Sequence, residues 1–173
     1  APVRPVTLNQ GYRMPSWFDI RYMVGNATTE ERESREEAAD SSKLINALIE
    51  AEHARGVPYS RIVLIGFSQG GAMSLYTGCR FPHSLAGMVC LSGYLLFPNI
   101  HLEESAASNR KTPILICHGT QDPMVPHDAG IKTRDFLTTH DWPVSFQDYP
   151  MQHEVCIQEI EKVDAFLRQQ LDG

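Results

Sequence analysis

Short apolar runs and longer amphipathic stretches alternate along most of the chain. Apolar runs bounded by turn residues predict strands, and they lie at 61–67, 85–93, 112–119 and 144–150. Apolar positions at helical spacing predict helices over 28–56, 70–81, 128–137 and the segment after residue 155. Strands that alternate with helices and read as nearly continuous apolar runs are typical of a parallel sheet covered on both faces. The pattern therefore predicts an α/β fold.

Polar residues mark the start of several predicted helices. Thr28 or Thr29 can cap the first helix, whose opening turn is acidic, and Asp128 can cap the helix that ends at Leu137. Residues 1–27 mix prolines and glycines with aromatic residues, which indicates an ordered loop region with short extended pieces. The last helix has an apolar stripe formed by Cys156, Ile160, Val163 and Leu167.

Length and charge narrow the class of protein. A chain of 173 residues favours one domain, residues 1–173. The net charge is −6 and Lys and Arg form no cluster, which argues against a nucleic-acid partner or an acidic membrane surface. The longest apolar stretches are much shorter than a membrane span, so we expect no stable membrane insertion.

Cysteine and histidine usage gives no sign of a metal or cofactor. The sequence contains no C-x-x-C and no clustered set of His and carboxylate ligands, so we expect neither metal nor cofactor. Widely spaced cysteines predict reduced, mostly buried thiols in a cytoplasmic protein. They are Cys79, Cys90, Cys117 and Cys156.

The stretch "GFSQG" fits G-x-S-x-G, the pattern of a nucleophile elbow between a strand and a helix. Ser68 lies at the sharp turn. We expect positions 66 and 70 to require small residues, here Gly66 and Gly70, because side chains there would collide with the neighbouring strand and helix. The following helix directs its N-terminus at the site, where its dipole favours negative charge. The backbone N–H of Gln69 would face the same point. A glycine-rich turn with an incidental serine is the alternative interpretation.

A serine hydroxyl becomes a good nucleophile only when a base takes its proton. In an elbow-type hydrolase the partners follow in the order Ser, acid, His. Asp122 follows the strand at 112–119, and His153 follows the strand at 144–150. We therefore predict Ser68, Asp122 and His153 as a catalytic triad.

Other histidines and carboxylates fit the triad less well. His118 ends a strand and is expected to shape the turn that carries Asp122, and His127 is too close to Asp122 to approach from another loop. His140 follows a helix and is expected to be solvated. Asp135 is expected on a helix surface and Asp141 in a loop.

With these motifs, the chain resembles the acyl-protein thioesterase, lysophospholipase and carboxylesterase family of small α/β-hydrolases. The resemblance rests on "APVRPVTLNQGYRMPSWFDI", "GFSQGGAMSLYT", "LSGYL", "CHGTQDPMVP" and "YPMQHEVC". It implies hydrolysis of small to medium acyl esters or thioesters through an acyl-enzyme, without a cofactor. It also implies an apolar acyl groove near the nucleophile, formed by Tyr94, Leu95, Met124 and Val125.

The chain departs from the family pattern at its start. Family members have a strand, an H-G-x-G-type loop and a helix before the "APVRP" segment, and this chain contains no such loop. We therefore expect a domain that is incomplete at its N-terminus, with the strand at 61–67 at the sheet edge and self-association or strand swapping as a result. The alternative function is a catalytically inactive fragment or paralogue that serves as a binding or oligomerising module.

Overall fold

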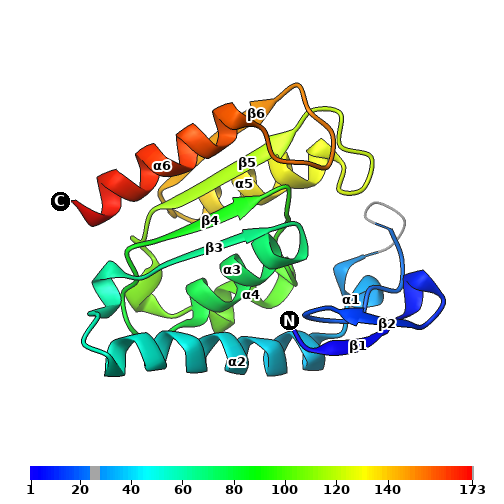
Figure 1. Cartoon of the computed structure of the whole chain (residues 1–173), viewed down its shortest axis with the longest axis horizontal. Helices are drawn as coiled ribbons and strands as arrows, with labels where there is room; N and C mark the ends of the chain where they lie inside the picture. The colour runs from blue at the N-terminus through cyan, green and yellow to red at the C-terminus, as the bar shows by residue number, and fades with distance from the viewer. Residues whose placement is uncertain (24–27, 173) are drawn as a thin grey trace.

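The computed structural model describes residues 1–23 and 28–172, and within them the chain forms an N-terminal hairpin and a four-stranded sheet (Figure 1). Strands β1 (Val3–Val6) and β2 (Tyr12–Pro15) pair antiparallel to make the hairpin. These are the short extended pieces predicted within residues 1–27. Positions 24–27 of that region lie outside the described residues.

The main sheet contains the predicted strands in their order along the chain. Strands β3 (Val63–Phe67), β4 (Gly87–Leu91), β5 (Ile114–Gly119) and β6 (Val144–Tyr149) are arranged β3-β4-β5-β6, and every neighbouring pair is parallel. All four strand predictions are confirmed. Because the strands are parallel, their carboxyl ends lie along one edge of the sheet, where ligands of open α/β sheets bind.

The strands differ in how well they are covered. Every residue of β4 and β5 is buried, as expected for interior strands of a parallel sheet. In the described part of the chain β3 is an edge strand, as the sequence predicted, and it exposes 46% of Ile65 and 37% of Phe67.

Helices cover both faces of the sheet (Figure 1). Helices α3 (Gln69–Arg80) and α5 (His127–Thr139) pack on one face, with α2 (Arg35–Ala54) against α3. Their apolar side chains meet those of the sheet in a cluster that includes Leu75, Met88, Ile116 and Leu137. Helix α6 (Ile157–Leu171) packs on the other face, where Val163 and Phe166 contact Val89 and Leu115.

The helix predicted from Thr28 to Gly56 is two helices. Helix α1 (Thr29–Arg32) begins after Thr28, whose Oγ1 accepts a hydrogen bond from the N–H of Glu31. Glu33 then leaves the helical path and pairs with Ile20 in an isolated bridge. Ser34 caps α2 by accepting from the N–H of Glu37 at 3.2 Å. A second capping residue, Ser34, thus starts a new helix.

Two other expectations need correction. Helix α5 begins after Pro126 without a side-chain cap, and Asp128 lies in its first turn, where it pairs with Lys132 at 2.6 Å. Helix α4 (Pro98–Glu104) was not predicted. It starts with Pro at its first position, a placement that suits the missing N–H of proline.

Candidate active site

Ser68 lies between β3 and α3, at the carboxyl end of the sheet. Its backbone is in a strained region, with φ of 54° and ψ of −120°. A Cβ built on Gly66 would lie 2.1 Å from the backbone of Gly70, so only glycine fits at position 66. This close approach agrees with the glycine predicted at position 66, and it lets the chain turn sharply enough to present the serine.

The second glycine requirement falls one position later than predicted. A Cβ at Gly70 would meet only the indole nitrogen of Trp17, at 3.9 Å, which is ordinary contact. A Cβ at Gly71 would lie 2.9 Å from the carbonyl oxygen of Gly66 and 3.0 Å from the Cys90 sulfur. The crowded position is therefore Gly71, because it faces β3 and β4 whereas Gly70 does not.

The predicted acid and base meet the serine in one chain of hydrogen bonds. His153 Nε2 lies 2.9 Å from Ser68 Oγ, and His153 Nδ1 lies 2.7 Å from Asp122 Oδ2. The three residues come from the loops after β3, β5 and β6, which meet because these strands are parallel. Phe67 packs beside the imidazole, with ring centroids 4.8 Å apart.

Asp122 is held by its own turn. Its Oδ1 accepts the backbone N–H groups of Met124 at 2.8 Å and Val125 at 2.9 Å, which leaves Oδ2 for His153. The fully buried His118 lies below this turn, with Nε2 at 2.9 Å from the Val125 carbonyl oxygen. Burial lowers the pKa of His118, so the ring is neutral near pH 7 and Nε2–H donates to that carbonyl. The expected turn-shaping role of His118 is confirmed.

The remaining rival residues lie away from Ser68. His127 Nε2 is 3.4 Å from Asp148 Oδ2 on β6. His140 is half-buried rather than solvated, because its Nδ1 bonds the carbonyl of Phe136 at 2.7 Å and its ring packs on that side chain. Asp135 is on the surface of α5, as expected.

An apolar pocket of about 80 Å³ opens beside Ser68 and His153. Predicted residues Tyr94, Met124 and Val125 line it. Leu95 does not: its side chain is buried among residues of α3, α5 and the sheet, and its N–H donates to Thr133. Leu95 follows Tyr94 directly, but the two side chains belong to different apolar clusters. Sequence reasoning missed the wall from the N-terminal region, formed by Leu8, Ile20, Tyr22 and Met23.

The Tyr94 side chain is held in place by Arg32 and Glu33. Its hydroxyl donates to Glu33 Oε1 at 2.8 Å, and the guanidinium of Arg32 lies over its ring at 4.7 Å. Arg32 and Glu33 form a buried ion pair. Burial raises the pKa of Tyr94 well above its ordinary value, so the phenol is neutral and presents its ring to the pocket.

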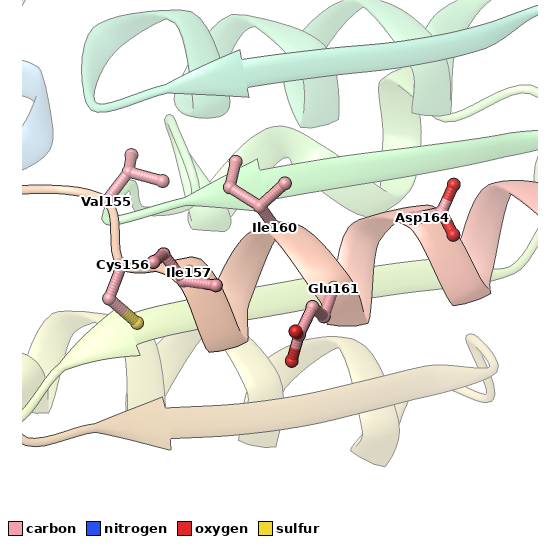
Figure 2. A pocket seen from close by; sticks show the side chains of 6 residues that line it. All are labelled: Val155, Cys156, Ile157, Ile160, Glu161 and Asp164. Carbon is pink, nitrogen blue, oxygen red and sulfur yellow. The ribbon is translucent and has the colours of Figure 1, made fainter.

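A second hollow, of about 520 Å³, lies beside α6 and does not include the triad (Figure 2). Figure 2 shows Val155 and Ile160 on one side of the helix and the Cys156 thiol on the other. Ile157 is 74% exposed and Ile160 is 54% exposed, so the predicted apolar stripe is only partly buried. The hollow offers mainly apolar surface, and its lining has the Cys156 thiol and the carboxylates of Glu161 and Asp164 but no serine or histidine.

Within residues 1–23 and 28–172, no group of three or more His, Cys, Asp or Glu side chains is arranged to hold a metal ion. Over the same residues, no helix has the length and apolarity needed to cross a membrane.

The parallel sheet with helices on both faces, and a serine at the turn from β3 to α3, define the α/β-hydrolase fold. Residues 1–171 match the family described as Phospholipase/Carboxylesterase, and the chain belongs to that family.

Individual relatives agree with this assignment. Acyl-protein thioesterase 1 of Neurospora crassa is 39% identical over 175 residues, a match that covers 99% of this chain and 71% of the relative. The enzyme of the same name from Gibberella zeae is also 39% identical, and 74% of it is covered. Among solved structures, Arabidopsis thaliana SOBER1 has a TM-score of 0.90 at 31% identity. The match covers 99% of this chain and 81% of the SOBER1 chain. Zea mays acyl-protein thioesterase 2 has a TM-score of 0.83 at 28% identity, with coverage of 99% and 79%.

Proposed function

We propose that the chain is a serine hydrolase that cleaves carboxylic esters or thioesters of small to medium acyl groups. The observation that carries the proposal is the unbroken hydrogen-bond chain from Ser68 Oγ through His153 to Asp122. Family membership supports the coarser class of ester hydrolase, and relatives named acyl-protein thioesterase make thioesters a reasonable substrate.

In the proposed mechanism Ser68 Oγ attacks the acyl carbonyl while His153 Nε2 takes the hydroxyl proton. Asp122 holds the imidazole by Nδ1 and stabilises its charged form. His153 then protonates the leaving group, and water hydrolyses the acyl-enzyme by the reverse sequence. The N–H of Gln69 supports the oxyanion, because the first residue of α3 has no intrahelical partner for its N–H. No cofactor takes part in these steps.

The pocket supports an acyl substrate of limited size. Its lining is largely apolar, and its volume of about 80 Å³ suits a short chain better than a long one. The backbone strain at Ser68 and the double hydrogen bond to Asp122 Oδ1 favour a prepared catalytic site over an incidental serine. The free thiols of Cys79, Cys90 and Cys117, all buried, fit the cytoplasmic setting that we propose.

The decisive experiment combines active-site labelling with turnover. We expect a fluorophosphonate probe to label the wild-type chain and not Ser68→Ala. Turnover of a short-chain para-nitrophenyl ester should fall on the order of 10⁶-fold in that variant, as in a serine protease that lacks its nucleophile. Ser145→Ala is the matched control, because Ser145 is exposed on β6 and outside the site. Ester turnover within about tenfold of wild type in Ser68→Ala would contradict the triad.

The same experiment separates the alternative function. A binding or oligomerising module without activity needs no activated serine, so the probe would leave it unlabelled. Circular dichroism would show that the unlabelled chain is folded. Labelling of Ser68 without measurable turnover would instead show an activated nucleophile whose substrate has not been found.

A further inference from the structure

The Gln69 side chain is bound at both ends to the segment 16–18. Its Oε1 accepts the backbone N–H of Trp17 at 2.7 Å, and its Nε2 donates to the Phe18 carbonyl at 2.8 Å. Nε2 also lies 3.1 Å from Ser16 Oγ, whose hydroxyl donates to the same Phe18 carbonyl at 2.6 Å. The residue that follows the nucleophile therefore holds a segment about fifty positions earlier in the chain.

This segment leads directly into the wall of the acyl pocket. Ile20 and Tyr22 line the pocket, and Leu8 joins them because its N–H donates to the Ile20 carbonyl at 2.8 Å. Between Gln69 and that wall, Phe18 is fully buried in a cluster that includes Ala72 and Met73 of α3. The position of the wall relative to Ser68 thus depends on how segment 16–18 is docked on α3.

We propose that the Gln69 side chain is a specificity-determining positioning residue. It fixes the wall of Leu8, Ile20 and Tyr22 at a set distance from Ser68 and thereby limits the length of the acyl chain that the pocket accepts. The inference rests on the proposed hydrolase function and deepens it. Gln69 thus has two roles: its backbone N–H faces the oxyanion, and its side chain holds the wall of Leu8, Ile20 and Tyr22 in place.

The contacts require an amide. One end must accept from Trp17 N–H while the other donates to the Phe18 carbonyl, and only an amide offers an acceptor and two donors at this spacing. Glutamate would direct a carboxylate oxygen at the Phe18 carbonyl. Methionine would leave the Trp17 N–H without its acceptor and the Phe18 carbonyl with the Ser16 hydroxyl as its remaining donor. Gln69→Met keeps the length of the side chain and removes both bonds, so it is the variant of choice.

The test compares acyl-length profiles for para-nitrophenyl acetate, butyrate and octanoate. In Gln69→Met we expect the ratio of kcat/KM for octanoate to that for acetate to rise about tenfold, the scale of one methylene in an apolar pocket. The rise should come from a lower KM for octanoate, because a displaced wall leaves more room for the chain. Gln147→Met, at an exposed position on β6, is the matched control and should keep the wild-type ratio.

Ser16→Ala tests the same hydrogen-bond network through the partner of Gln69. It leaves the nucleophile elbow unchanged, so a folding defect at the elbow cannot explain its effect. It removes the hydroxyl that joins Nε2 to the Phe18 carbonyl, so the ratio should shift in the same direction by a smaller factor. An unchanged or lower ratio in both variants overturns the proposal. A uniform loss for all three esters also overturns it, since that result assigns Gln69 to the oxyanion or to stability alone.

A second measurement does not depend on activity. Amide hydrogen exchange at Trp17 should become faster in Gln69→Met, because its N–H loses its acceptor. Protection at Trp17 equal to that of wild type overturns the positioning role. If the wild-type chain hydrolyses no ester and is not labelled at Ser68, the proposed function fails, while faster exchange at Trp17 still supports the docking role of Gln69.

Discussion

Two buried carboxylates, one before His153 in the chain and one after it, differ in their surroundings. Asp122 precedes His153, and its side chain is fully buried with three hydrogen bonds, from Met124 N–H, Val125 N–H and His153. Glu159 follows His153, on α6, and is also fully buried. Among the described residues neither oxygen of Glu159 has a hydrogen-bond partner.

The difference shows that burial alone does not decide the charge of a carboxylate. Hydrogen bonds donated to a carboxylate stabilise its charged form, whereas burial without donors favours the neutral acid. Burial raises the pKa of Glu159 from its ordinary value of 4.5 to about 7. Near neutral pH, Glu159 is therefore partly protonated in its place beside Cys117 and Tyr149.

The largest effect is expected when the hydrogen-bonded carboxylate loses its charge. Asp122→Asn keeps the shape of the turn but no longer stabilises the imidazolium or the correct tautomer of His153. We expect kcat for a short-chain ester to fall about 10⁴-fold, as in the corresponding variant of a serine protease. Asp135→Asn on the surface of α5 is the control and should retain wild-type kcat. A loss smaller than about tenfold would show that Asp122 is structural only.

The parallel sheet and the meeting of the three predicted triad residues could be predicted from the sequence. Glycine at position 66 and the order of Ser68, Asp122 and His153 at three strand ends give strong constraints, because a parallel sheet brings those ends together. The docked wall of Leu8 and Ile20 could not be predicted, because it depends on how the segment 16–18 docks on α3. No pattern in the sequence records that contact.

The burial of Glu159 could not be predicted, because the buried face of α6 is rotated from the predicted apolar stripe and shares Val163 with it. The sequence favoured Cys156, Ile160, Val163 and Leu167 as the buried positions. The structure buries Glu159, Val163 and Phe166, which also follow helical spacing, and leaves Ile160 54% exposed. Glutamate in a helical pattern favours the solvent face, and only three-dimensional packing shows that Glu159 is buried.

A second prediction concerns the carboxylate without partners. Because the folded-state pKa of Glu159 is raised, the folded chain binds more protons than the unfolded chain between about pH 4.5 and 7, so its stability falls as pH rises through that window. Glu159→Gln cannot ionise and should lack this loss. We expect the variant to gain up to roughly 3 kcal/mol over wild type between about pH 5 and pH 8, at about 1.4 kcal/mol for each pKa unit.

Urea unfolding at the two pH values measures this gain. Glu161→Gln, on the exposed side of the same helix, is the matched control and should follow the wild-type pH dependence. Ester kcat/KM should stay at the wild-type value in both variants, because neither residue contacts the site. Equal pH dependence in wild type and Glu159→Gln would contradict the uncompensated burial of this carboxyl.

The smallest effect is expected at a carboxylate that has a partner but is not buried. Asp128 pairs with Lys132 at 2.6 Å in the first turn of α5, and its side chain is 65% exposed. Water screens such pairs, so Asp128→Asn should lower the free energy of unfolding by no more than about 0.5 kcal/mol at low salt. The difference should shrink further in about 1 M NaCl, where charges are screened within about 3 Å. Lys132→Gln should produce a loss of the same size, and the double variant should lose less than the sum. A loss above about 1 kcal/mol that persists at high salt would show that ion pairing at the surface of this fold matters as much as burial, contrary to what Asp122 and Glu159 indicate.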